Sequence, residues 1–444
     1  MRIIIAGAGD VGFHLAKLLA LENHDITLID VDREKLEYIS KHLDVRTIKG
    51  SSTSLKTLKN ANIERTKLLI SVTSSEEVNF TTAVLGKRLG AERTVARISN
   101  VEFLYNRDEP FMKEIGIDEV ISPVTLAARE IKRLITHAAL TDHFQFERGK
   151  LSLMGIKIEE ESPLNGKILS DVIPLSERKF CNVAILRNNE TLIPDENSRF
   201  HTNDHAYFVA CPAGEEKVIN LATHSSLNIK RIMILGGSNV GYHASRILGK
   251  RYKVKLVDHD RKRCEQIAEE LGNVLVINGD PQDIDLLKEE GIEEMDAVIA
   301  VSQNSETNII SCLLAKNLGV AKTISLVENI DYIQLSQSVG VDTMINKKLI
   351  AANFIFRYIR KGDVLALASI HGSDCEVLEF EVKKGNKIQD KTVGELDFPE
   401  GAIIGGVIRR GEGQVPDEGF VFQERDHIVI LSKPQCIHQV ESYF

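Results

Sequence analysis

Residues 3–12 read IIIAGAGDVG, an apolar run followed by three glycines spaced as GxGxxG. The run predicts a buried strand and the residues after it predict a helix, while Asp30 closes the next apolar run about 20 residues later. This order is typical of a dinucleotide-binding fold. In such a fold Gly7 permits a tight turn, Gly9 lets the backbone approach a pyrophosphate, and Gly12 allows the helix to pack closely on the strand. The helix N-terminus would then offer unpaired N–H groups to the phosphates.

Asp30 predicts the class of nucleotide. Its carboxylate would accept hydrogen bonds from both ribose hydroxyls, and its charge would repel a 2′-phosphate. The fingerprint therefore favours NAD(H) or another adenosine nucleotide over NADP. The alternative is a glycine-tight turn in an α/β fold that holds no ligand.

The same signature occurs a second time. Residues 232–241 read IMILGGSNVG, so Gly236 corresponds to Gly7 and Gly241 to Gly12, an offset of 229 (236 − 7). LIDVDR (28–33) likewise corresponds to LVDHDR (256–261), and LLISVTSSEEVN (68–79) to AVIAVSQNSETN (297–308). The chain is therefore a tandem duplication of a unit of about half its length.

Each repeat begins with alternating strand-like and helix-like runs, which predict a parallel sheet covered by helices on both faces. In the first repeat Ser122 is the expected N-cap of a helix that starts at Pro123. This helix and residues 350–359 both carry an apolar stripe. The stripes predict packing either inside the chain's own core or against another subunit.

Short alternating runs with Asn, Gly and Pro between them follow each predicted sheet domain, and they indicate a small antiparallel β unit. The predicted fold class is α/β, with two Rossmann-like parallel-sheet domains, each followed by a small β-rich α+β module. Polar stretches at 213–230 and 360–373 are expected to be joints. The predicted boundaries are 1–122 (first sheet domain), 123–143 (connecting helix), 144–215 (first β-rich module), 216–229 (linker), 230–346 (second sheet domain), 347–373 (connecting helix and joint) and 374–444 (second module).

Composition narrows the class of protein. The 444 residues are 43% hydrophobic and 27% charged, with a formal net charge of -9, which argues against nucleic acid as a partner. The longest apolar runs have strand length rather than the ~20 residues of a membrane span, and the N-terminus lacks a signal-peptide pattern. Six scattered cysteines fit reduced thiols. A cytoplasmic location is expected.

Further candidate contacts follow two strands of the first repeat. Thr73 and Ser74 come after the run 68–72, at the carboxyl end where ligands of open α/β sheets bind. They are candidate lining residues, although hydroxyls that cap the helix beginning near Glu76 are an equal alternative. Arg97 ends another strand and could place its guanidinium on a phosphate or on adenine.

The second copy is incomplete. Ser238 replaces the middle glycine and Leu326 replaces Arg97, whereas Asp258 retains the acid. The second site is therefore weaker, selective for another nucleotide, or structural only.

Catalytic and metal-binding patterns are missing from the sequence. The thirteen histidines show no HExxH motif or Cys/His spacing, and no P-loop lysine follows the glycines. His14 and His243, two residues after the last glycine of each loop, are expected to pack rather than to act as bases. Asp204-His205 and Asp426-His427 are expected in loops or at edges, because adjacent strand residues point to opposite faces. No catalytic residue and no metal ligand is predicted.

The chain resembles the TrkA family, which is built from RCK (KTN) domains. The resemblance lies in GAGDVG with LIDVD, SVTSSEEVN and ARI, followed by a β-rich module, and in the duplication of this order. The resemblance implies a non-enzymatic cytosolic regulatory subunit that binds NAD(H) and ATP or ADP. It also implies a homo-oligomeric ring, expected to be a tetramer, that gates a membrane potassium channel and lies at the inner face of the cell membrane through that partner. The modules at 144–215 and 374–444 match by order and texture only, so no residue roles transfer to them.

The predicted nucleotide contacts combine the fingerprint with this resemblance. They are Gly7, Ala8, Gly9, Asp10, Val11, Gly12, Asp30, Thr73, Ser74 and Arg97 in the first repeat, and Gly236, Gly237, Ser238, Asn239, Val240, Gly241 and Asp258 in the second.

Two other functions remain open. An NAD-dependent oxidoreductase would need a base beside the nicotinamide, but the small modules lack clustered His, Lys or Asp. A scaffold with vestigial nucleotide folds would bind no ligand.

Overall fold

The computed structural model separates into two compact units, each made of two stretches of chain. One unit contains Met1–Lys132 and Lys230–Ile359, and the other contains Arg133–Ile229 and Arg360–Phe444. The described residues are 1–20, 24–99, 109–138, 140–172, 179–188, 190–222, 229–329, 332, 340–360, 364–370, 373 and 375–444. The two sheet domains of the duplicated sequence thus share one unit, and the two β-rich modules share the other.

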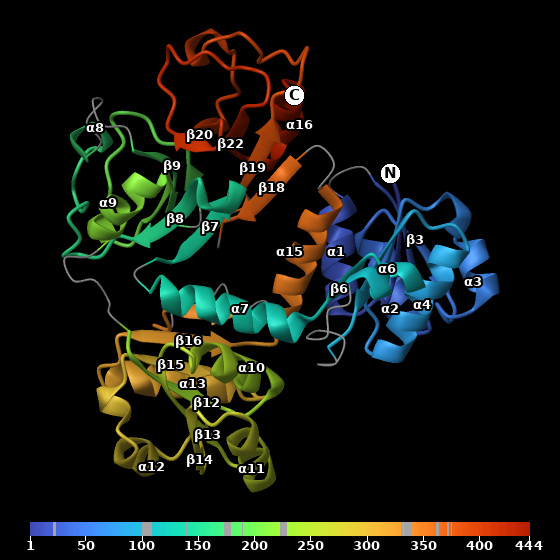
Figure 1. Ribbon diagram of the computed structural model, residues 1–444, viewed down its shortest axis with the longest axis vertical. Coiled ribbons are helices and arrows are strands. Elements are labelled where there is room, and N and C mark those ends of the chain that lie inside the picture. Colours follow the sequence, from blue (N-terminus) through green and yellow to red (C-terminus); the bar gives the residue numbers. More distant parts are fainter. Residues whose placement is uncertain are drawn as a thin grey trace. The chain divides into compact units, whose positions relative to one another are not determined.

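The first sheet domain is a doubly wound parallel sheet with strand order β3-β2-β1-β4-β5-β6. Figure 1 shows its helices around the strands. Its elements are β1 (Arg2–Ala6), α1 (Asp10–Ala20), β2 (Asp25–Asp30), α2 (Arg33–His42), β3 (Arg46–Lys49), α3 (Leu55–Asn60), η1 (Ile63–Arg65), β4 (Leu68–Ser71), α4 (Glu76–Arg88), β5 (Arg93–Arg97), α6 (Glu109–Ile115) and β6 (Glu119–Ile121).

The second sheet domain repeats this topology as β14-β13-β12-β15-β16-β17, again all parallel. Its elements are β12 (Arg231–Leu235), α10 (Asn239–Leu248), β13 (Lys253–Asp258), α11 (Arg261–Glu270), β14 (Val274–Asn278), α12 (Ile284–Glu289), η3 (Ile292–Glu294), β15 (Ala297–Ala300), α13 (Ser305–Asn317), β16 (Lys322–Leu326) and β17 (Thr343–Ile345).

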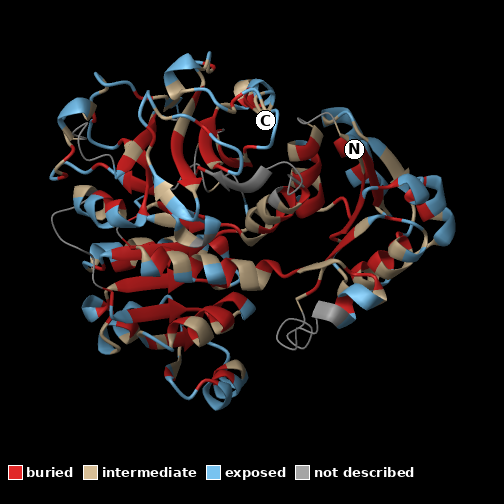
Figure 2. Cartoon of the chain, turned by 45° about the horizontal axis from the view of Figure 1, so that its top comes forward, coloured by how far each residue is buried: buried red, intermediate tan, exposed pale blue. Residues whose placement is uncertain are grey.

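Apolar strands explain why both sheets form. Ile3, Ile4 and Ile5 are all 0% exposed, as are Met233 and Ile234 in the second copy, because helices cover both faces of each sheet. Figure 2 shows this as buried strands inside each domain, with exposed residues on the outer turns of the helices. The predicted Rossmann-like fold class is confirmed.

Two long helices follow the sheets, α7 (Pro123–Thr136) and α15 (Lys347–Arg360). Ser122 accepts a hydrogen bond from the Thr125 N–H and caps α7, as predicted. The apolar stripes of both helices are buried within the single chain: Ala127, Ala128 and Ile131 are 0% exposed, and Ile355 is also 0% exposed. Both stripes therefore pack in the chain's own core, which is one of their two predicted roles.

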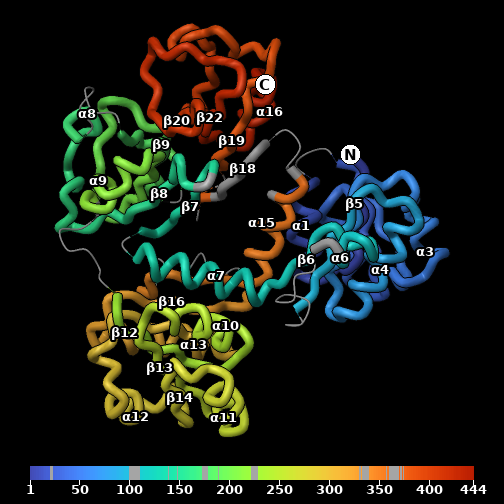
Figure 3. The backbone as a smooth tube through the Cα atoms, in the orientation of Figure 1, coloured from blue at the N-terminus to red at the C-terminus, as the bar shows by residue number. Residues whose placement is uncertain are grey.

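The two β-rich modules are antiparallel sheets of one shared topology, β10-β9-β11-β8-β7 and β21-β20-β22-β19-β18. A buried core contains residues of both, including Leu153 and Tyr207 of the first and Val377 and Val429 of the second. Figure 3 traces the chain through these modules. Their elements are β7 (Asp142–Phe146), η2 (Glu147–Gly149), β8 (Leu151–Lys157), α8 (Leu169–Val172), β9 (Phe180–Arg187), β10 (Glu190–Leu192), β11 (His205–Ala210), α9 (Pro212–Ala222), β18 (Val364–Ser369), β19 (Glu376–Glu381), η4 (Val393–Glu395), β20 (Ala402–Arg409), β21 (Glu412–Gln414), β22 (His427–Ser432), η5 (Pro434–Cys436) and α16 (Ile437–Glu441).

The two expected joints contain regular structure, which corrects the sequence interpretation of 213–230 and 360–373. Helix α9 occupies the start of the first stretch, including the beginning of the predicted linker 216–229, and its Val218 is 0% exposed in the module core. Strand β18 occupies the second and pairs with β19. Tertiary partners stabilise both segments, which local composition alone does not reveal. Residues 223–228, 361–363 and 371–372 of these stretches lie outside the described residues.

The six cysteines are all free thiols, as expected from their scattered positions. Among the described residues, no helix has both the length and the apolar character that a bilayer crossing requires.

Candidate nucleotide site and its incomplete copy

Gly7 and Gly12 adopt the geometry that the fingerprint predicts. Gly7 has a φ of +113°, and a Cβ there would lie 2.8 Å from the Thr73 nitrogen. A Cβ on Gly12 would lie 1.9 Å from the Gly7 carbonyl oxygen, so this glycine allows the first helical turn to fold back over the loop. Gly9 differs, because a Cβ there would have nothing within 4 Å. The space beside Gly9, in front of the helix, is therefore open.

Asp30 holds the glycine loop from the neighbouring strand. Its Oδ2 accepts a hydrogen bond of 2.6 Å from the Ala8 N–H, and its Oδ1 accepts one of 2.8 Å from the Asp32 N–H. Each carboxylate oxygen retains a free lone-pair direction. Asp30 also lines the cleft described below, so it fixes the loop and faces a ligand position at once.

Asn79 organises the loop after β4, a role that the sequence interpretation missed. Its side chain is 0% exposed, and its Oδ1 accepts hydrogen bonds from the Thr73 N–H and hydroxyl, both at 2.7 Å. Its amide donates to the carbonyls of Thr73 and Arg97, each at 3.0 Å. The helix cap expected at Thr73 or Ser74 is instead Ser75, whose hydroxyl accepts from the Val78 N–H. Thr73 therefore lines the cleft with a hydroxyl that is already engaged.

A cleft of about 460 Å³ lies at the carboxyl ends of the first sheet's strands, within the size range of small-molecule sites. Of the predicted contacts of the first repeat, Gly7, Gly9, Asp10, Val11, Asp30, Thr73, Ser74 and Arg97 line it. Ala8 and Gly12 contribute through the loop backbone, and Ala8 is 5% exposed. The lining residues that sequence reasoning did not select are Ile29, Val31, Asp32, Lys35, Gly50, Ser51, Ser52, Val72, Ser75, Val78, Pro123, Lys347 and Lys348.

Lys347 and Lys348 bring charge into this cleft from the second repeat. Lys348 Nζ lies 2.7 Å from a carboxylate oxygen of Asp10, the first residue of α1, and 2.9 Å from one of Glu328. Lys347 Nζ lies 2.6 Å from the other Glu328 oxygen. Burial lowers the pKa of Lys348, but the hydrogen bonds and charges of Asp10 and Glu328 outweigh burial and raise it above its usual value. Lys348 therefore stays cationic at the mouth of the glycine loop.

A local signal for these lysines exists in the sequence. They occupy the first turn of α15, after Asn346, whose side chain accepts from the backbone N–H groups of Lys348 and Leu349. Cations are unfavourable at a helix N-terminus, where the macrodipole is positive. A lysine pair in that position breaks a local rule, and such breaks are expected at functional sites.

Arg97 lines the same cleft but is not an isolated cation. Burial lowers the pKa of its guanidinium, while the charges of Glu76 and Glu328 act in the opposite direction. The cleft thus gathers four cations, Lys35, Arg97, Lys347 and Lys348, against three carboxylates, Asp10, Asp30 and Asp32. Glu328, which pairs with Lys347 and Lys348, and Glu76, whose charge acts on Arg97, also lie at these cations, so their charge is already balanced before a ligand binds.

The second loop has the same backbone but a different opening. Gly236 also has a φ of +113°, and a Cβ on Gly241 would lie 2.0 Å from the Gly236 oxygen. Ser238 is the N-cap of α10: its hydroxyl accepts from the Gly241 N–H at 3.3 Å and donates to the Val301 carbonyl at 2.6 Å. The loop's own side chain therefore satisfies a helix N–H group that a phosphate would otherwise contact.

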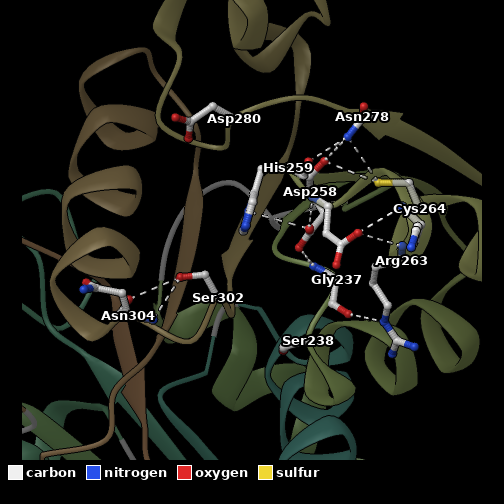
Figure 4. Close-up of polar contacts among 12 residues, drawn as sticks. Gly237, Ser238, Asp258, His259, Arg263, Cys264, Asn278, Asp280, Ser302 and Asn304 are labelled. Atoms are coloured by element: carbon white, nitrogen blue, oxygen red, sulfur yellow. Dashed lines mark hydrogen bonds and ion pairs between the residues drawn. The ribbon is translucent and has the colours of Figure 1, made fainter.

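Asp258 holds the second glycine loop through hydrogen bonds, as Asp30 holds the first, and Arg263 covers this loop. Asp258 accepts from the N–H groups of Gly237 and Asp260 and is 8% exposed. Arg263 donates to the Gly237 carbonyl at 2.8 Å and to the Asn239 side chain at 3.3 Å. Figure 4 shows the Arg263 side chain directed at the loop beside Asp258. The last predicted contact, Val240, is 3% exposed and packs at the start of α10.

The histidines near the loops pack, as predicted. Burial and the nearby Lys17 lower the pKa of His14, while burial, Arg246 and Arg263 lower that of His243, which is 3% exposed. Their surroundings therefore disfavour the protonated form of both rings. Asp204 and Asp426, each just before a strand, form buried ion pairs with Arg187 and Arg409 at 2.7 and 2.6 Å. These acids belong to structural pairs rather than to an acid–base couple with the adjacent histidines.

The fold and the loops define the class of protein: two Rossmann-like domains with nucleotide-type glycine loops, each followed by a small antiparallel module. Comparison with known families agrees. The model of the TrkA-N domain matches residues 3–123 and 232–347, and that of the TrkA-C domain matches 377–444. The chain belongs to the TrkA family.

Individual relatives support this assignment over the whole length. The chain is 34% identical over 452 residues to the Trk system potassium uptake protein TrkA of Haemophilus influenzae, covering 100% of this chain and 98% of that one. It is 30% identical over 457 residues to TrkA homolog 2 of Methanosarcina mazei, covering 100% of both. A solved structure described as the GsuK channel bound to NAD shares the fold, with a TM-score of 0.62 and 14% identity, over 99% of this chain and 79% of that chain.

Proposed function

We propose that this chain is a non-enzymatic regulatory subunit of a Trk-type potassium uptake system, and that NAD(H), ATP or ADP acts on it through the first cleft. The supporting observation is the composition of that cleft. It joins a glycine loop held by Asp30 to cations of the second repeat, Lys347 and Lys348. The full-length relatives named as potassium uptake proteins and the NAD-bound GsuK structure support the same proposal.

The Asp10–Lys348–Glu328 contacts suggest how ligand binding is transmitted. In the structure, Lys348 bridges the first helical turn of one sheet domain and Glu328 of the other. A phosphate at the N-terminus of α1 would compete with both carboxylates for Lys348, because it is likewise an anionic acceptor of charge-assisted hydrogen bonds. Binding then changes the forces between the two sheet domains. A differential affinity of only ~1–3 kcal/mol between two arrangements shifts a gating equilibrium about five- to 150-fold.

The proposal extends to assembly and location. The chain would form a homo-oligomeric ring, with a tetramer as the expected size, at the cytoplasmic face of the membrane, and would bind a potassium channel or transporter subunit there. The second loop would have the lower nucleotide affinity, since Ser238 and Arg263 already satisfy its polar groups. Each of these steps follows from the family and from the asymmetry of the two loops.

Two measurements test the proposal together. Calorimetric titration of the full chain with NAD(H), ATP and ADP should give a saturable first-site signal that Asp30→Ala removes. Potassium flux into vesicles that hold a Trk-type membrane subunit should change when chain and nucleotide are added, and the Asp30→Ala chain should not respond. Binding without any change in flux would refute regulation, and steady turnover of NADH with a metabolite would refute the non-enzymatic assignment.

A further inference from the structure

Glu147, Glu379 and His427 lie together in the unit formed by the β-rich modules, far from either glycine loop in sequence. A carboxylate oxygen of each glutamate and a ring nitrogen of the histidine all lie within 4.8 Å of one another. Glu379 Oε1 and His427 Nδ1 are 2.9 Å apart. The register pairs Glu379 with Val429 across β19 and β22, so Glu379 and His427 share one face of the sheet as diagonal neighbours.

The burial of Glu379 needs an explanation. Its side chain is 3% exposed, in a strand where Val377, Leu378 and Phe380 are at most 1% exposed. His427 provides the only hydrogen bond that the described residues give its carboxylate. Glu147 adds a second carboxyl group beside the same imidazole, so two carboxyl groups lie against one histidine ring.

The first module shows that the fold does not require this cluster. Gly155 lies opposite Tyr207 as Glu379 lies opposite Val429, and His205 corresponds to His427 in the register. A Cβ on Gly155 would lie 2.7 Å from the Thr141 hydroxyl and 2.8 Å from the Tyr207 ring, so no glutamate fits there. By contrast, the Arg187–Asp204 pair recurs as Arg409–Asp426. The buried glutamate is a property of the second module alone.

Glu147 comes from the first module, where it begins the short helix η2 between β7 and β8. The backbones of the two modules approach closely in this region, since a Cβ on Gly413 of β21 would lie 1.9 Å from the Lys150 carbonyl oxygen. Glu147 is exposed, and its flexible side chain can therefore close on a bound ion. The third ligand atom is supplied across the boundary between the two modules.

We propose that Glu147, Glu379 and His427 form a site for a transition-metal dication of the zinc type, which links the two β-rich modules. One imidazole nitrogen and two carboxylates match the ligands of Zn²⁺, whereas Ca²⁺ and Mg²⁺ prefer oxygen alone. Zinc bonds of about 2.0–2.2 Å require ligand atoms roughly 3–3.5 Å apart. Rotation of the exposed Glu147 side chain supplies the necessary closure. Water would occupy the remaining coordination position.

The test uses the full, metal-free chain titrated with Zn²⁺ in a calorimeter, and with Co²⁺ as a spectroscopic probe. We expect one Zn²⁺ per chain, at least tenfold weaker binding in Glu147→Gln, and loss of binding in His427→Gln. His205→Gln is the matched control in the first module and should bind like the wild type. Glu147→Gln changes an exposed side chain, so its result does not depend on tolerance of a core substitution.

Three results would overturn the site: no binding at micromolar Zn²⁺, equal binding by the wild type and both cluster variants, or a Co²⁺ spectrum with sulfur-to-metal charge transfer. The last result would assign the ion to cysteine thiols, of which the chain has six. Thermal unfolding gives an independent readout. Zn²⁺ should raise the melting temperature of the wild type and of His205→Gln, and should leave that of His427→Gln unchanged.

Discussion

The two glycine loops share a backbone and differ in what occupies the helix N-terminus. Gly7 and Gly236 have the same φ of +113°, and Asp30 and Asp258 each accept two backbone N–H groups near the loop. At Gly9 the space in front of the helix is open, whereas Ser238 uses its own hydroxyl there. The comparison separates the residues that build such a loop from those that leave it available to a ligand.

The loops also differ in their cations. Arg263 of the second copy belongs to α11 of the same domain and donates to the Gly237 carbonyl. In the first copy, Lys347 and Lys348 approach from another domain and hold carboxylates through salt bridges. A cation from the loop's own domain stabilises one arrangement, while a cation from the other domain can exchange partners. This difference makes the first loop the better candidate for a sensor.

The largest expected effect follows from removing the acid of one loop at a time. Asp30→Asn removes the charge and one acceptor from a carboxylate that accepts the Ala8 and Asp32 N–H groups. We expect about 100-fold weaker binding of NAD(H) or ATP, or ~2.7 kcal/mol, since hydrogen bonds to charged groups contribute about 1.5–3 kcal/mol each. Calorimetric titration measures the change. Asp258→Asn is the matched control, and an equal loss in both variants would show that the two loops do not differ in function.

A smaller effect is expected from exchanging the middle residues of the loops. Gly9→Ser should place a hydroxyl on the first turn of α1, as Ser238 does on α10, and weaken nucleotide binding about tenfold, or ~1.4 kcal/mol. Ser238→Gly should lower helix stability by only a few tenths of a kcal/mol and increase binding to the second loop. Stoichiometry from equilibrium dialysis at increasing nucleotide concentration reports both changes. If Gly9→Ser binds as tightly as the wild type, the serine does not explain the asymmetry.

Much of the sheet domains was predictable from the sequence because their signals are local. The periodic apolar runs, the glycine spacing and the Ser122 cap each depend on a few adjacent residues, and the structure has the corresponding strands, turn and cap. The roles of α9 and β18 were not predictable in this way. Their short sequences become ordered through neighbouring strands rather than through their own propensity.

The site was predictable only where its residues belong to one sheet domain. Gly7, Asp30 and Thr73 follow strands of one domain, so the parallel topology brings them together. Lys347 and Lys348 line the same cleft but lie more than half the chain away. The lysine pair at the start of a helix is visible in the sequence, but only the folded structure shows that it lines this cleft. Asn79 was visible as a repeat marker, yet its hydrogen bonds to Thr73 depend on the bend between β4 and α4.

Removal of the Lys348 ammonium tests whether the first loop depends on the second repeat. Lys348→Ala should weaken ATP binding about five- to tenfold, because one charge-assisted contact to phosphate is lost while Asp10 becomes unpaired. Higher salt should reduce the difference between variant and wild type. Lys255→Ala is a suitable control, since its ammonium is equally exposed and pairs with Glu290 outside the cleft. Unchanged ATP affinity in Lys348→Ala would show that this lysine of the second repeat takes no part in ATP binding.

The smallest effect is expected at the position where the copies differ as Arg97 and Leu326. Arg97 lies near Glu76 and Glu328, so part of its charge is already compensated before any ligand binds. Arg97→Leu should therefore weaken nucleotide binding only about two- to fourfold, or less than ~1 kcal/mol, as is usual for a partly screened ion pair. The reciprocal change, Leu326→Arg, should not create affinity at the second loop, because Ser238 still occupies the helix N-terminus there. Titration of both variants with ATP measures these effects. A loss above tenfold in Arg97→Leu, or a gain of second-loop binding in Leu326→Arg, would contradict the prediction. Arg97 rather than the loop residue would then be the main source of the asymmetry.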